Sequence, residues 1–459
     1  MKKTLTVIAL STMLAAPALA EETATGGLNM KMKGIDLNFG GFIEAASVYR
    51  AKNQNSDLAT GYTGLPLANS PSYNQEETRF SARQSRLSIL AKGDYNSSTH
   101  LAGYYEMDFL GAAGTANQKE SNSYNPRIRH LYTTADWDSM GLHLLAGQTW
   151  SLTTLNNKGI TPRNEVTPLG IEAQYVPGFT WARQPQFRIV KDFDKTLWLA
   201  LSVENPQTAV AGSSSAGANY TINQGTATKG NMGDVLSVNS YPDVVVKASF
   251  DPSWGHFEIY DLIRTFQSDA YLTATPNVVN STKTTTNAIG GGAILPIVPK
   301  QLTLTLSGLY GKGIGRYGSA QLPDVTYDAS GNLIPVKGYQ LLAGLIYDPT
   351  SDWNFYTYYG QENVDKTGTD GATKSGYGSE AVIDNSGAGT LGGTVGGNVQ
   401  RVSQGTVGTW WKCYQGSAGK MQAGLQYSYT ENKYFNVTKG GAPLATNNIF
   451  FTSLRYYWN

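Results

Sequence analysis

The stretch from Ile35 to Arg50 reads IDLNFGGFIEAASVYR, and its pattern decides the fold. Odd-numbered positions such as Leu37, Phe39 and Ile43 are mainly apolar, whereas the even-numbered positions are mixed and largely polar. A period of two residues predicts a β-strand with one apolar face, because successive side chains of a strand point to opposite sides. The stretch is also long enough to cross a bilayer, which a tilted strand does in about 9 to 11 residues.

The same period recurs along the rest of the chain. Segments with this pattern cover 35–50, 79–92, 99–110, 127–135, 142–150, 181–191, 196–204, 242–250, 256–266, 284–294, 301–311, 338–347, 353–361, 400–414, 420–430 and 447–458. Each has about the length that a transmembrane strand needs, or slightly more. The sequence therefore predicts about 16 strands.

The connections between these segments alternate strictly in length. Every second link is a short turn, such as Asp348-Pro349-Thr350-Ser351-Asp352, and the others are long and rich in Gly, Ser, Asn and Thr. The long links cover 51–78, 111–126, 151–180, 205–241, 267–283, 312–337, 362–399 and 431–446. This alternation is typical of transmembrane barrels, which have short periplasmic turns and long extracellular loops.

The fold class that follows is all-β: a transmembrane antiparallel β-barrel of about 16 strands. Hydrocarbon offers no partner for backbone N–H and C=O groups, so a sheet in lipid must close on itself. A soluble β-propeller is the alternative. Its blades would recur at a fixed period of about 40 to 50 residues with a blade motif, and the sequence shows neither.

The composition fits a chain in which every second residue of each strand faces lipid. Charged residues make up only 15% of the 459 residues, against about 25% in an average soluble protein. The formal net charge of +1 gives no surplus of lysine and arginine for a nucleic-acid partner. The single cysteine, Cys413, excludes an internal disulfide and a zinc site made of cysteines. No metal or cofactor is predicted.

The N-terminus has the pattern of a secretory signal. Lys2 and Lys3 precede an apolar stretch from Leu5 to Ala16, and Ala18-Leu19-Ala20 supplies the small residues that signal peptidase accepts. The chain is therefore predicted to divide into a signal peptide at 1–20, a short segment at 21–34 and the barrel at 35–459. A signal peptide followed by a barrel predicts the outer membrane of a Gram-negative bacterium.

The C-terminal tail resembles the last strand of Gram-negative outer-membrane proteins. From Phe450 to Asn459, aromatic and apolar residues occupy the alternate positions 450, 454, 456 and 458. The resemblance implies recognition by the barrel-assembly machinery and a surrounding of outer-membrane lipid and lipopolysaccharide. That family usually ends on Phe or Trp, whereas here Trp458 is the penultimate residue.

Three further stretches look like trimeric porins, most closely the DcaP-like group. They are Arg127–Tyr132 (RIRHLY), Leu145–Ser151 (LAGQTWS) and Leu201–Pro206 (LSVENP). The resemblance covers most of the barrel with short motifs. It implies a sixteen-stranded homotrimer with three separate pores and, for the DcaP-like group, a preference for anionic solutes.

The alternation of side chains along each strand predicts which charged residues line the pore. Arg86, Arg127, Arg129 and Arg188 lie opposite the apolar positions of their strands, as do Glu106 and Asp108. Arg79 and Arg83 share the apolar parity, but a bulge or the nearby loop boundary would turn them inward. An arginine row facing two acids would create a transverse field that favours anions. In the alternative, these charges pair across the wall and only make it rigid.

The third long link, 151–180, is the candidate constriction loop. It carries Lys158, Arg163, Glu165 and Glu172, and three prolines stiffen its backbone. In trimeric porins the third loop folds into the lumen, and the resemblance alone carries that expectation here. The alternative is an ordinary surface loop.

Aromatic residues near strand ends predict belts at the two membrane interfaces. The candidates are Tyr49, Tyr105, Tyr132, Trp353, Tyr359, Trp410, Tyr456 and Trp458.

An enzyme is not predicted, because none of the four histidines neighbours a nucleophile and an acid in a matching position. His130 has the apolar parity of its strand, which favours a belt or packing position for it.

The sequence thus predicts an outer-membrane porin for the passive diffusion of small hydrophilic solutes, and of anions where the arginines outnumber the accessible acids. Two alternatives stay open. One is a substrate-specific channel for an organic acid or a sugar. The other is a plugged barrel that serves as a receptor or adhesin.

Overall fold

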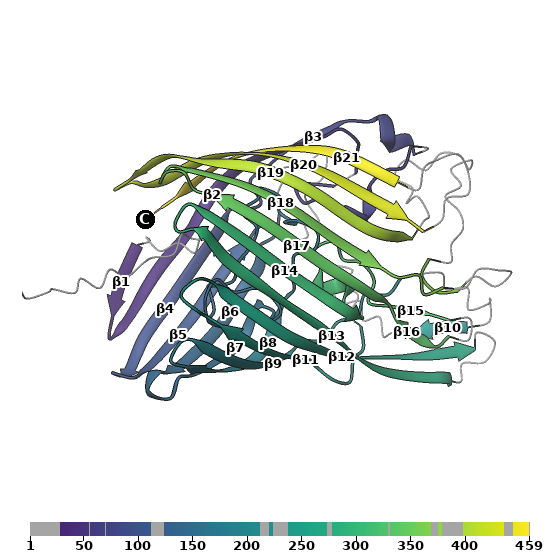
Figure 1. Cartoon of the computed structure of the whole chain (residues 1–459), viewed down its shortest axis with the longest axis horizontal. Coiled ribbons are helices and arrows are strands. Elements are labelled where there is room, and N and C mark those ends of the chain that lie inside the picture. The colour runs from purple at the N-terminus through teal and green to yellow at the C-terminus, as the bar shows by residue number, and fades with distance from the viewer. Residues whose placement is uncertain are drawn as a thin grey trace, which may run out of the picture.

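The computed structural model describes residues 28–54, 56–68, 70–111, 124–211, 220–223, 237–272, 278–328, 331–368, 375–378, 398–435 and 444–458. The signal peptide predicted at 1–20 lies outside the described residues, and so does most of the segment predicted at 21–34. Within this part of the chain the regular structure is strand, apart from short 3₁₀ turns (Figure 1). None of the described helices is long and apolar enough to span a membrane.

The strands form one closed antiparallel barrel. Its first half consists of β2 (Ile35–Arg50), β3 (Glu77–Ser81) with β4 (Arg86–Asn96), β5 (Thr99–Asp108), β6 (Arg127–Trp137), β7 (Leu142–Trp150), β8 (Arg183–Phe193) and β9 (Leu197–Glu204). Its second half consists of β11 (Asp243–Phe250), β12 (His256–Leu272), β13 (Val278–Val298), β14 (Leu302–Lys312), β17 (Lys337–Tyr347), β18 (Trp353–Val364), β19 (Val399–Gly416), β20 (Gly419–Tyr434) and β21 (Leu444–Tyr457).

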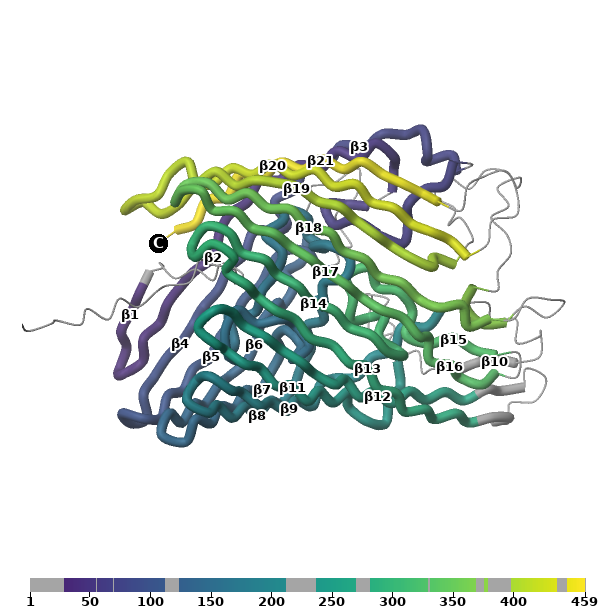
Figure 2. Tube along the Cα trace, viewed as in Figure 1, coloured from purple at the N-terminus to yellow at the C-terminus, as the bar shows by residue number. Residues whose placement is uncertain are grey.

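The barrel closes where β2 pairs with β21, from Phe42 opposite Tyr457 to Arg50 opposite Ile449. Counting β3 and β4 as two halves of one wall position, sixteen strands make the wall. The predicted fold class is confirmed. Figure 2 shows the two ends of the barrel: short turns join the strands on the left and the long connections lie on the right.

The wall strands alternate between two environments. In β9, Leu199 and Leu201 are exposed on the outer face, whereas Trp198, Ala200 and Ser202 are buried on the inner face. The same alternation runs through β8, β17, β18 and β20. An apolar outer face and a mixed inner face are what a barrel in a bilayer requires.

Several elements lie outside the wall. β1 (Leu28–Met32) forms a hairpin with the start of β2, and its turn residues Lys33 and Gly34 both have positive φ angles, as a tight two-residue hairpin demands. β1 belongs to the segment that the sequence placed before the first strand. β10 (Tyr220–Asn223) pairs with the end of β12, and β15 (Val325–Tyr327) pairs with β16 (Leu333–Pro335). The described 3₁₀ turns are η1 (Tyr62–Gly64), η2 (Pro71–Asn74), η3 (Asp138–Met140) and η5 (Gly315–Tyr317).

One of the predicted long links is mostly strand. β12 and β13 continue as a paired hairpin beyond their neighbours, so the connection expected at 267–283 shortens to 273–277. The polar residues of this hairpin resemble loop composition, which is why the period of two was not evident there. The other connections at the long-loop end stay long.

The second wall position is interrupted. β2 pairs with β3 through Ala46 to Arg50 and with β4 through Ile35 to Phe42, and the two registers differ by one residue. A shift of one residue exchanges the inner and outer faces of a strand. Odd-numbered residues of β3 therefore share the inner face, whereas even-numbered residues do so in β4.

Candidate functional site: a lumen crossed by loop 151–182

The connection between β7 and β8, residues 151–182, crosses the inside of the barrel. Asn156 N donates to Glu258 Oε1 of β12 at 3.1 Å, and Leu169 N donates to the Tyr358 hydroxyl of β18 at 3.0 Å. Ile171 N donates to Gln426 Oε1 of β20 at 2.5 Å. These partners lie on the inner faces of strands from both halves of the wall, so the loop lies within the lumen.

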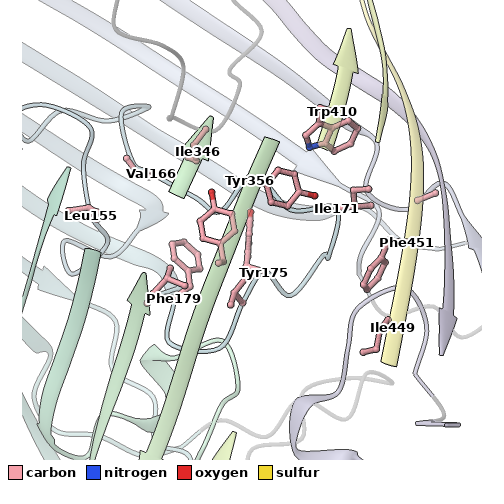
Figure 3. Close-up of a cluster of buried hydrophobic side chains, with 14 of the residues drawn as sticks. Leu155, Val166, Ile171, Tyr175, Phe179, Ile346, Tyr356, Trp410, Ile449 and Phe451 are labelled. Atoms are coloured by element: carbon pink, nitrogen blue, oxygen red, sulfur yellow. The ribbon is translucent and has the colours of Figure 1, made fainter. Parts of the chain in front are cut away.

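Apolar packing holds the loop in place (Figure 3). Ile171, Tyr175 and Phe179 of the loop are buried in one cluster with Trp410 of β19 and Phe451 of β21. Burying each such side chain contributes about 1.5 to 3 kcal/mol. The loop is thus packed inside the barrel and is not a surface loop.

Buried carboxylates of the wall accept the loop's backbone amides. Glu204 Oε1 accepts from Leu152 N at 2.8 Å. Glu362 Oε1 accepts from Gly178 N at 2.8 Å and from Ala320 N at 2.9 Å. Glu362 therefore fixes loop 151–182 and the next inward connection, 313–336, through one oxygen atom. Charge-assisted bonds of this kind are about twice as strong as neutral ones.

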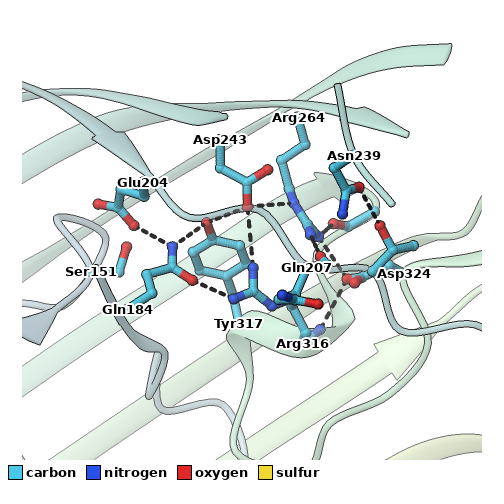
Figure 4. A network of polar contacts seen from close by, with 12 residues as sticks. Ser151, Gln184, Glu204, Gln207, Asn239, Asp243, Arg264, Arg316, Tyr317 and Asp324 are labelled. Carbon is cyan, nitrogen blue, oxygen red and sulfur yellow. Dashed lines mark hydrogen bonds and ion pairs between the residues drawn. The ribbon is translucent and has the colours of Figure 1, made fainter. Parts of the chain in front are cut away.

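Polar contacts fix the connection 313–336 to the wall at the long-loop end (Figure 4). Arg264 of β12 lies 3.1 Å from Asp243 of β11 and 2.7 Å from Asp324 of the connection. Arg316 pairs with Asp243 at 3.2 Å, and the Tyr317 hydroxyl donates to the same carboxylate at 2.9 Å. This network was not predicted from sequence, because its members lie far apart in the chain.

Four of the predicted pore charges form one cluster on β5 and β6. Arg127 donates to both oxygens of Asp108, at 3.0 and 2.7 Å. Arg129 Nε donates to Glu106 Oε1 at 2.6 Å, and Arg129 Nη1 donates to Asp108 Oδ2 at 3.1 Å. Glu106, Asp108 and Arg129 are buried, whereas Arg127 remains partly exposed.

A bulge in β6 sets the direction of these side chains. Glu106 pairs with His130 and Met107 pairs with Ile128, so Arg129 is the extra residue of the ladder. The bulge reverses the parity of the rest of the strand. His130 and Tyr132 consequently face inward and are buried. The predicted place of Tyr132 in an outer aromatic belt is wrong, whereas His130 takes the packing position that was one of its two predicted places.

Trp410 also faces inward rather than toward the membrane interface. It is buried, and its indole N–H donates to Leu169 O of the loop at 2.7 Å. Its neighbour Trp411 is exposed on the outer face. Two consecutive tryptophans must point to opposite sides of a strand, and the sequence pattern chose the wrong one.

Arg86 and Arg188 lie on the inner face at different places. Arg86 Nη1 is 3.9 Å from Glu106 Oε1, and its guanidinium lies 5.3 Å from the centre of the Phe42 ring. Arg188 is buried and donates to Gln186 Oε1 at 3.0 Å and to Trp150 O at 2.8 Å. Arg188 thereby supports the start of the loop.

Arg79 and Arg83 lie at the interruption between β3 and β4. Arg79 pairs opposite the buried Val48 and forms an ion pair with Glu77 at 3.4 Å. Arg83 forms an ion pair with Asp57, and it donates to Phe109 O at 3.1 Å and Gly111 O at 3.0 Å. Arg83 thus links two of the long connections, the one between β2 and β3 and the one that follows β5.

The four charges predicted on the loop have different surroundings. Lys158 is exposed, and Arg163 Nη1 donates to the Tyr132 hydroxyl at 2.8 Å. Glu165 is buried, and its Oε2 accepts from Asn164 N at 3.1 Å. Glu172 is buried and accepts from Thr60 N at 2.9 Å, which ties the loop to the first long connection. Burial raises the pKa of the Glu172 carboxyl above its ordinary value.

Arg183 is a further arginine near this charged cluster, which the sequence analysis missed. Its guanidinium lies 4.7 Å from the centre of the Trp150 ring, within electrostatic range of Arg127 and Arg129. Its Nη1 is buried without a hydrogen-bond partner among the described residues. Arg183 has the parity of the exposed Phe187, so alternation alone assigns it to the outer face.

A cavity of about 440 Å³ lies beside the loop. Its lining contains the basic residues Arg86, Lys300, Lys412 and Arg455 and the acidic residues Glu172 and Asp348. Arg455 lies between two aromatic rings, 4.9 Å from the centre of Phe42 and 4.5 Å from that of Trp410. The cavity is therefore basic and partly aromatic.

Comparison with solved protein structures supports the barrel fold described above. The outer membrane channel DcaP of Acinetobacter baumannii superposes with a TM-score of 0.65 at 16% identity, over 94% of this chain and 100% of that chain. The chain has the fold of an outer-membrane porin. OmpF of Salmonella typhi, solved in complex with daunomycin, gives a TM-score of 0.50 at 8% identity, over 94% of this chain and 100% of that chain. No family model and no curated protein sequence matches the chain.

Three of the four histidines, His100, His143 and His256, contact carboxylates near the short turns. His100 Nδ1 lies 2.6 Å from Asp94, and His143 Nδ1 lies 2.7 Å from Asp136. Among the described residues, no group of three or more His, Cys, Asp or Glu side chains is arranged to hold a metal ion.

Proposed function

We propose that the protein is an outer-membrane porin through which small hydrophilic solutes diffuse passively, anions in preference to cations. The observation that carries this proposal is a surplus of arginine where loop 151–182 crosses the lumen. Arg86, Arg127, Arg129, Arg163 and Arg183 gather there, against Glu106, Asp108 and Glu165. A lumen lined by one sign of charge concentrates the opposite ion.

Two of these arginines are the best candidates to act on a passing ion. Arg127 and Arg129 are held by Asp108 and Glu106, so much of their charge is compensated. Arg163 and Arg183 make no ion pair with an acid among the described residues; one contacts a tyrosine hydroxyl and the other an indole ring. Their uncompensated charge supports anion selectivity.

The test is the reversal potential of the purified protein in a planar bilayer under a KCl gradient. We expect the wild type to favour chloride, and the double variant Arg163→Gln/Arg183→Gln to lower the chloride-to-potassium permeability ratio severalfold. Arg401→Gln is the matched control, because Arg401 pairs with Glu431 at 2.8 Å on the outer side of the wall. An unchanged ratio in the double variant would overturn the assignment.

The cavity beside the loop favours a second candidate, a substrate-specific channel for an organic acid. Its four basic residues and its aromatic rings line a cavity of about 440 Å³, within the size range of about 300 to 1,000 Å³ of small-molecule pockets. Single-channel recordings with acetate, phosphate and glucose separate the two. Saturable block by one solute favours the specific channel, and a large unblocked conductance favours the general pore. A plugged receptor or adhesin would conduct nothing.

We further propose that the porin is a homotrimer in the outer membrane of a Gram-negative bacterium, surrounded by lipid and lipopolysaccharide. The closure of β21 on β2 supports an assembly route in which the barrel-assembly machinery recognises the C-terminal strand. Light scattering in detergent tests the trimer through the protein mass of the particle. A monomeric mass in mild detergent would contradict it.

A further inference from the structure

Residues 155–166 of the inward loop form a short hairpin inside the lumen. Its two arms are joined by an isolated bridge between Asn156 and Glu165 and by backbone hydrogen bonds on both sides of that bridge. The turn between the arms carries Arg163, one of the two arginines proposed above to act on a passing anion. Whatever holds this hairpin in place therefore also positions Arg163.

Two carboxylates and a lysine of the wall hold the first arm of the hairpin. Asp251, in the short turn between β11 and β12, accepts from Gly159 N at 2.9 Å. Glu258 of β12 accepts from Asn156 N at 3.1 Å. Lys247 of β11 donates to Asn156 Oδ1 at 3.0 Å, and its Nζ lies 2.6 Å from Glu258 Oε2. The hairpin thus depends on two buried acids and one buried cation of the wall.

His256, the first residue of β12, lies between the two carboxylates. Its Nδ1 is 2.6 Å from Asp251 Oδ1 and its Nε2 is 3.0 Å from Glu258 Oε1, and all three side chains are buried. A neutral imidazole has one N–H and directs the lone pair of its other nitrogen at a carboxylate, whereas the imidazolium carries a proton on each nitrogen. When His256 is protonated, it and Lys247 balance the two acids. The geometry therefore fits the imidazolium.

The other groups around His256 leave this balance in place. Glu165 of the hairpin and Arg188 of β8 are within electrostatic range of Lys247, and their charges are opposite. The register partner of His256 on β13 is the apolar Ile294. The charged residues of the neighbouring turn between β8 and β9 are exposed to solvent: Asp194 and Lys195.

We propose that His256 is a positioning residue, whose imidazolium form holds the hairpin 155–166 in the lumen. Imidazole is the side chain that changes its charge near neutral pH. When His256 loses its proton, a lone pair faces one of the two carboxylates, and Lys247 is left to balance both acids. The hairpin then loosens as the pH rises through the titration of His256. The effect on conduction rests on the proposed anion selectivity: because Arg163 moves with the hairpin, the preference for chloride should weaken at high pH.

Hydrogen exchange of the purified protein in detergent, read by mass spectrometry, tests the positioning without any conduction. After correction for the intrinsic pH dependence of exchange, we expect the protection of residues 154–160 to fall with rising pH between about pH 5 and 8. The fall should be about tenfold, as the loss of one charge-assisted hydrogen bond implies. His256→Gln stays neutral and should abolish this pH profile. Asp251→Asn keeps an oxygen for Gly159 N but removes a charge that favours the imidazolium, so the midpoint should move to lower pH by about one unit.

His100→Gln is the matched control, because His100 also contacts two carboxylates, Asp94 at 2.6 Å and Asp138 at 3.3 Å, near other short turns. It should keep the wild-type exchange profile. A wild-type protection that does not change with pH overturns the proposal. A His256→Gln variant that keeps the wild-type profile overturns it as well.

Reversal potentials under a KCl gradient, recorded over the same pH range, give the second readout. The chloride-to-potassium permeability ratio of the wild type should fall severalfold as the pH rises, and that of His256→Gln should stay constant. A chloride preference that is independent of pH, beside an exchange profile that is not, would show that the hairpin does not position Arg163 and would overturn the proposal. A wild type without any chloride preference contradicts the proposed function instead, and the exchange profile alone then decides the role of His256.

Discussion

Arg129 shows at the scale of one residue how the lumen combines charge with stability. It is buried and holds both Glu106 and Asp108, which are buried as well. Removing one partner of a buried pair costs about 3 to 5 kcal/mol, because it leaves an uncompensated charge. We therefore expect Arg129→Gln to lower the free energy of unfolding by that amount, measured by urea titration in lipid vesicles.

A double variant checks the cause of that loss. Adding Glu106→Gln to Arg129→Gln removes a buried carboxylate that has lost its nearest cation, although Arg86 remains 3.9 Å away, and should recover part of the stability. Arg183→Gln is the control among the arginines, since Arg183 contacts a ring rather than an acid, and its loss should cost less. A loss for Arg183→Gln equal to that for Arg129→Gln would show that the pairing is not the source of the stability.

Single residues also mark the limit of prediction from this sequence. Alternation places Arg86 and Arg188 on inner faces, because Arg86 shares the even-numbered face of β4 with the buried Ser88 and β8 pairs without irregularity around Arg188. It fails for Tyr132 and Arg183, since a bulge at Arg129 and the boundary of a loop change the parity. The pairing of Arg127 with Asp108 could not be predicted, because it depends on the register between two strands.

At the scale of an element, Glu362 controls how two loops occupy the lumen. It accepts backbone amides from Gly178 and Ala320. Glu362→Ala should release both loops and give larger, noisier single-channel currents. Glu362→Gln keeps an acceptor oxygen and should stay close to the wild type. Identical recordings for the alanine variant and the wild type would mean that apolar packing alone positions the loops.

The burial of Glu172 gives the loop a pH dependence. Burial raises the pKa of Glu172 above its ordinary value of 4.5, so the folded state favours the protonated acid. The contribution to stability is then fully present below about pH 4.5 and is lost as the pH rises through the raised pKa. We expect Glu172→Gln, which stays neutral, to flatten this part of the curve of unfolding free energy against pH. An unchanged curve would exclude Glu172 as its source.

The inward fold of loop 151–182 could not be derived from its own residues. Its charges and prolines are equally compatible with a surface loop, and the resemblance to porins alone favoured the lumen. The deciding contacts come from Glu258, Tyr358 and Gln426 on strands that lie far along the chain. Loops of this kind depend on the whole barrel, whereas the strands carry their pattern locally.

At the scale of the whole molecule, closure joins residues that are distant in sequence. The Ser47 and Thr452 hydroxyls lie 2.6 Å apart across the seam between β2 and β21. The number of wall strands follows from the sequence, because each outer face is apolar at every second residue over a membrane thickness. β1 and the break between β3 and β4 do not, since short or interrupted strands give too few periods to recognise.

The apolar outer face makes a depth-dependent prediction for the barrel as a whole. Leu197 and Leu201 lie on the outer face of the same strand and are 41% and 43% exposed, but Leu197 is its first residue, beside a short turn. In a bilayer, Leu201→Arg should cost about 2 to 4 kcal/mol and Leu197→Arg about 0 to 1 kcal/mol, because the penalty falls toward the interface. Urea unfolding in lipid vesicles measures both. Equal costs for the two variants would show that this face does not lie in hydrocarbon, since water imposes no gradient along a strand.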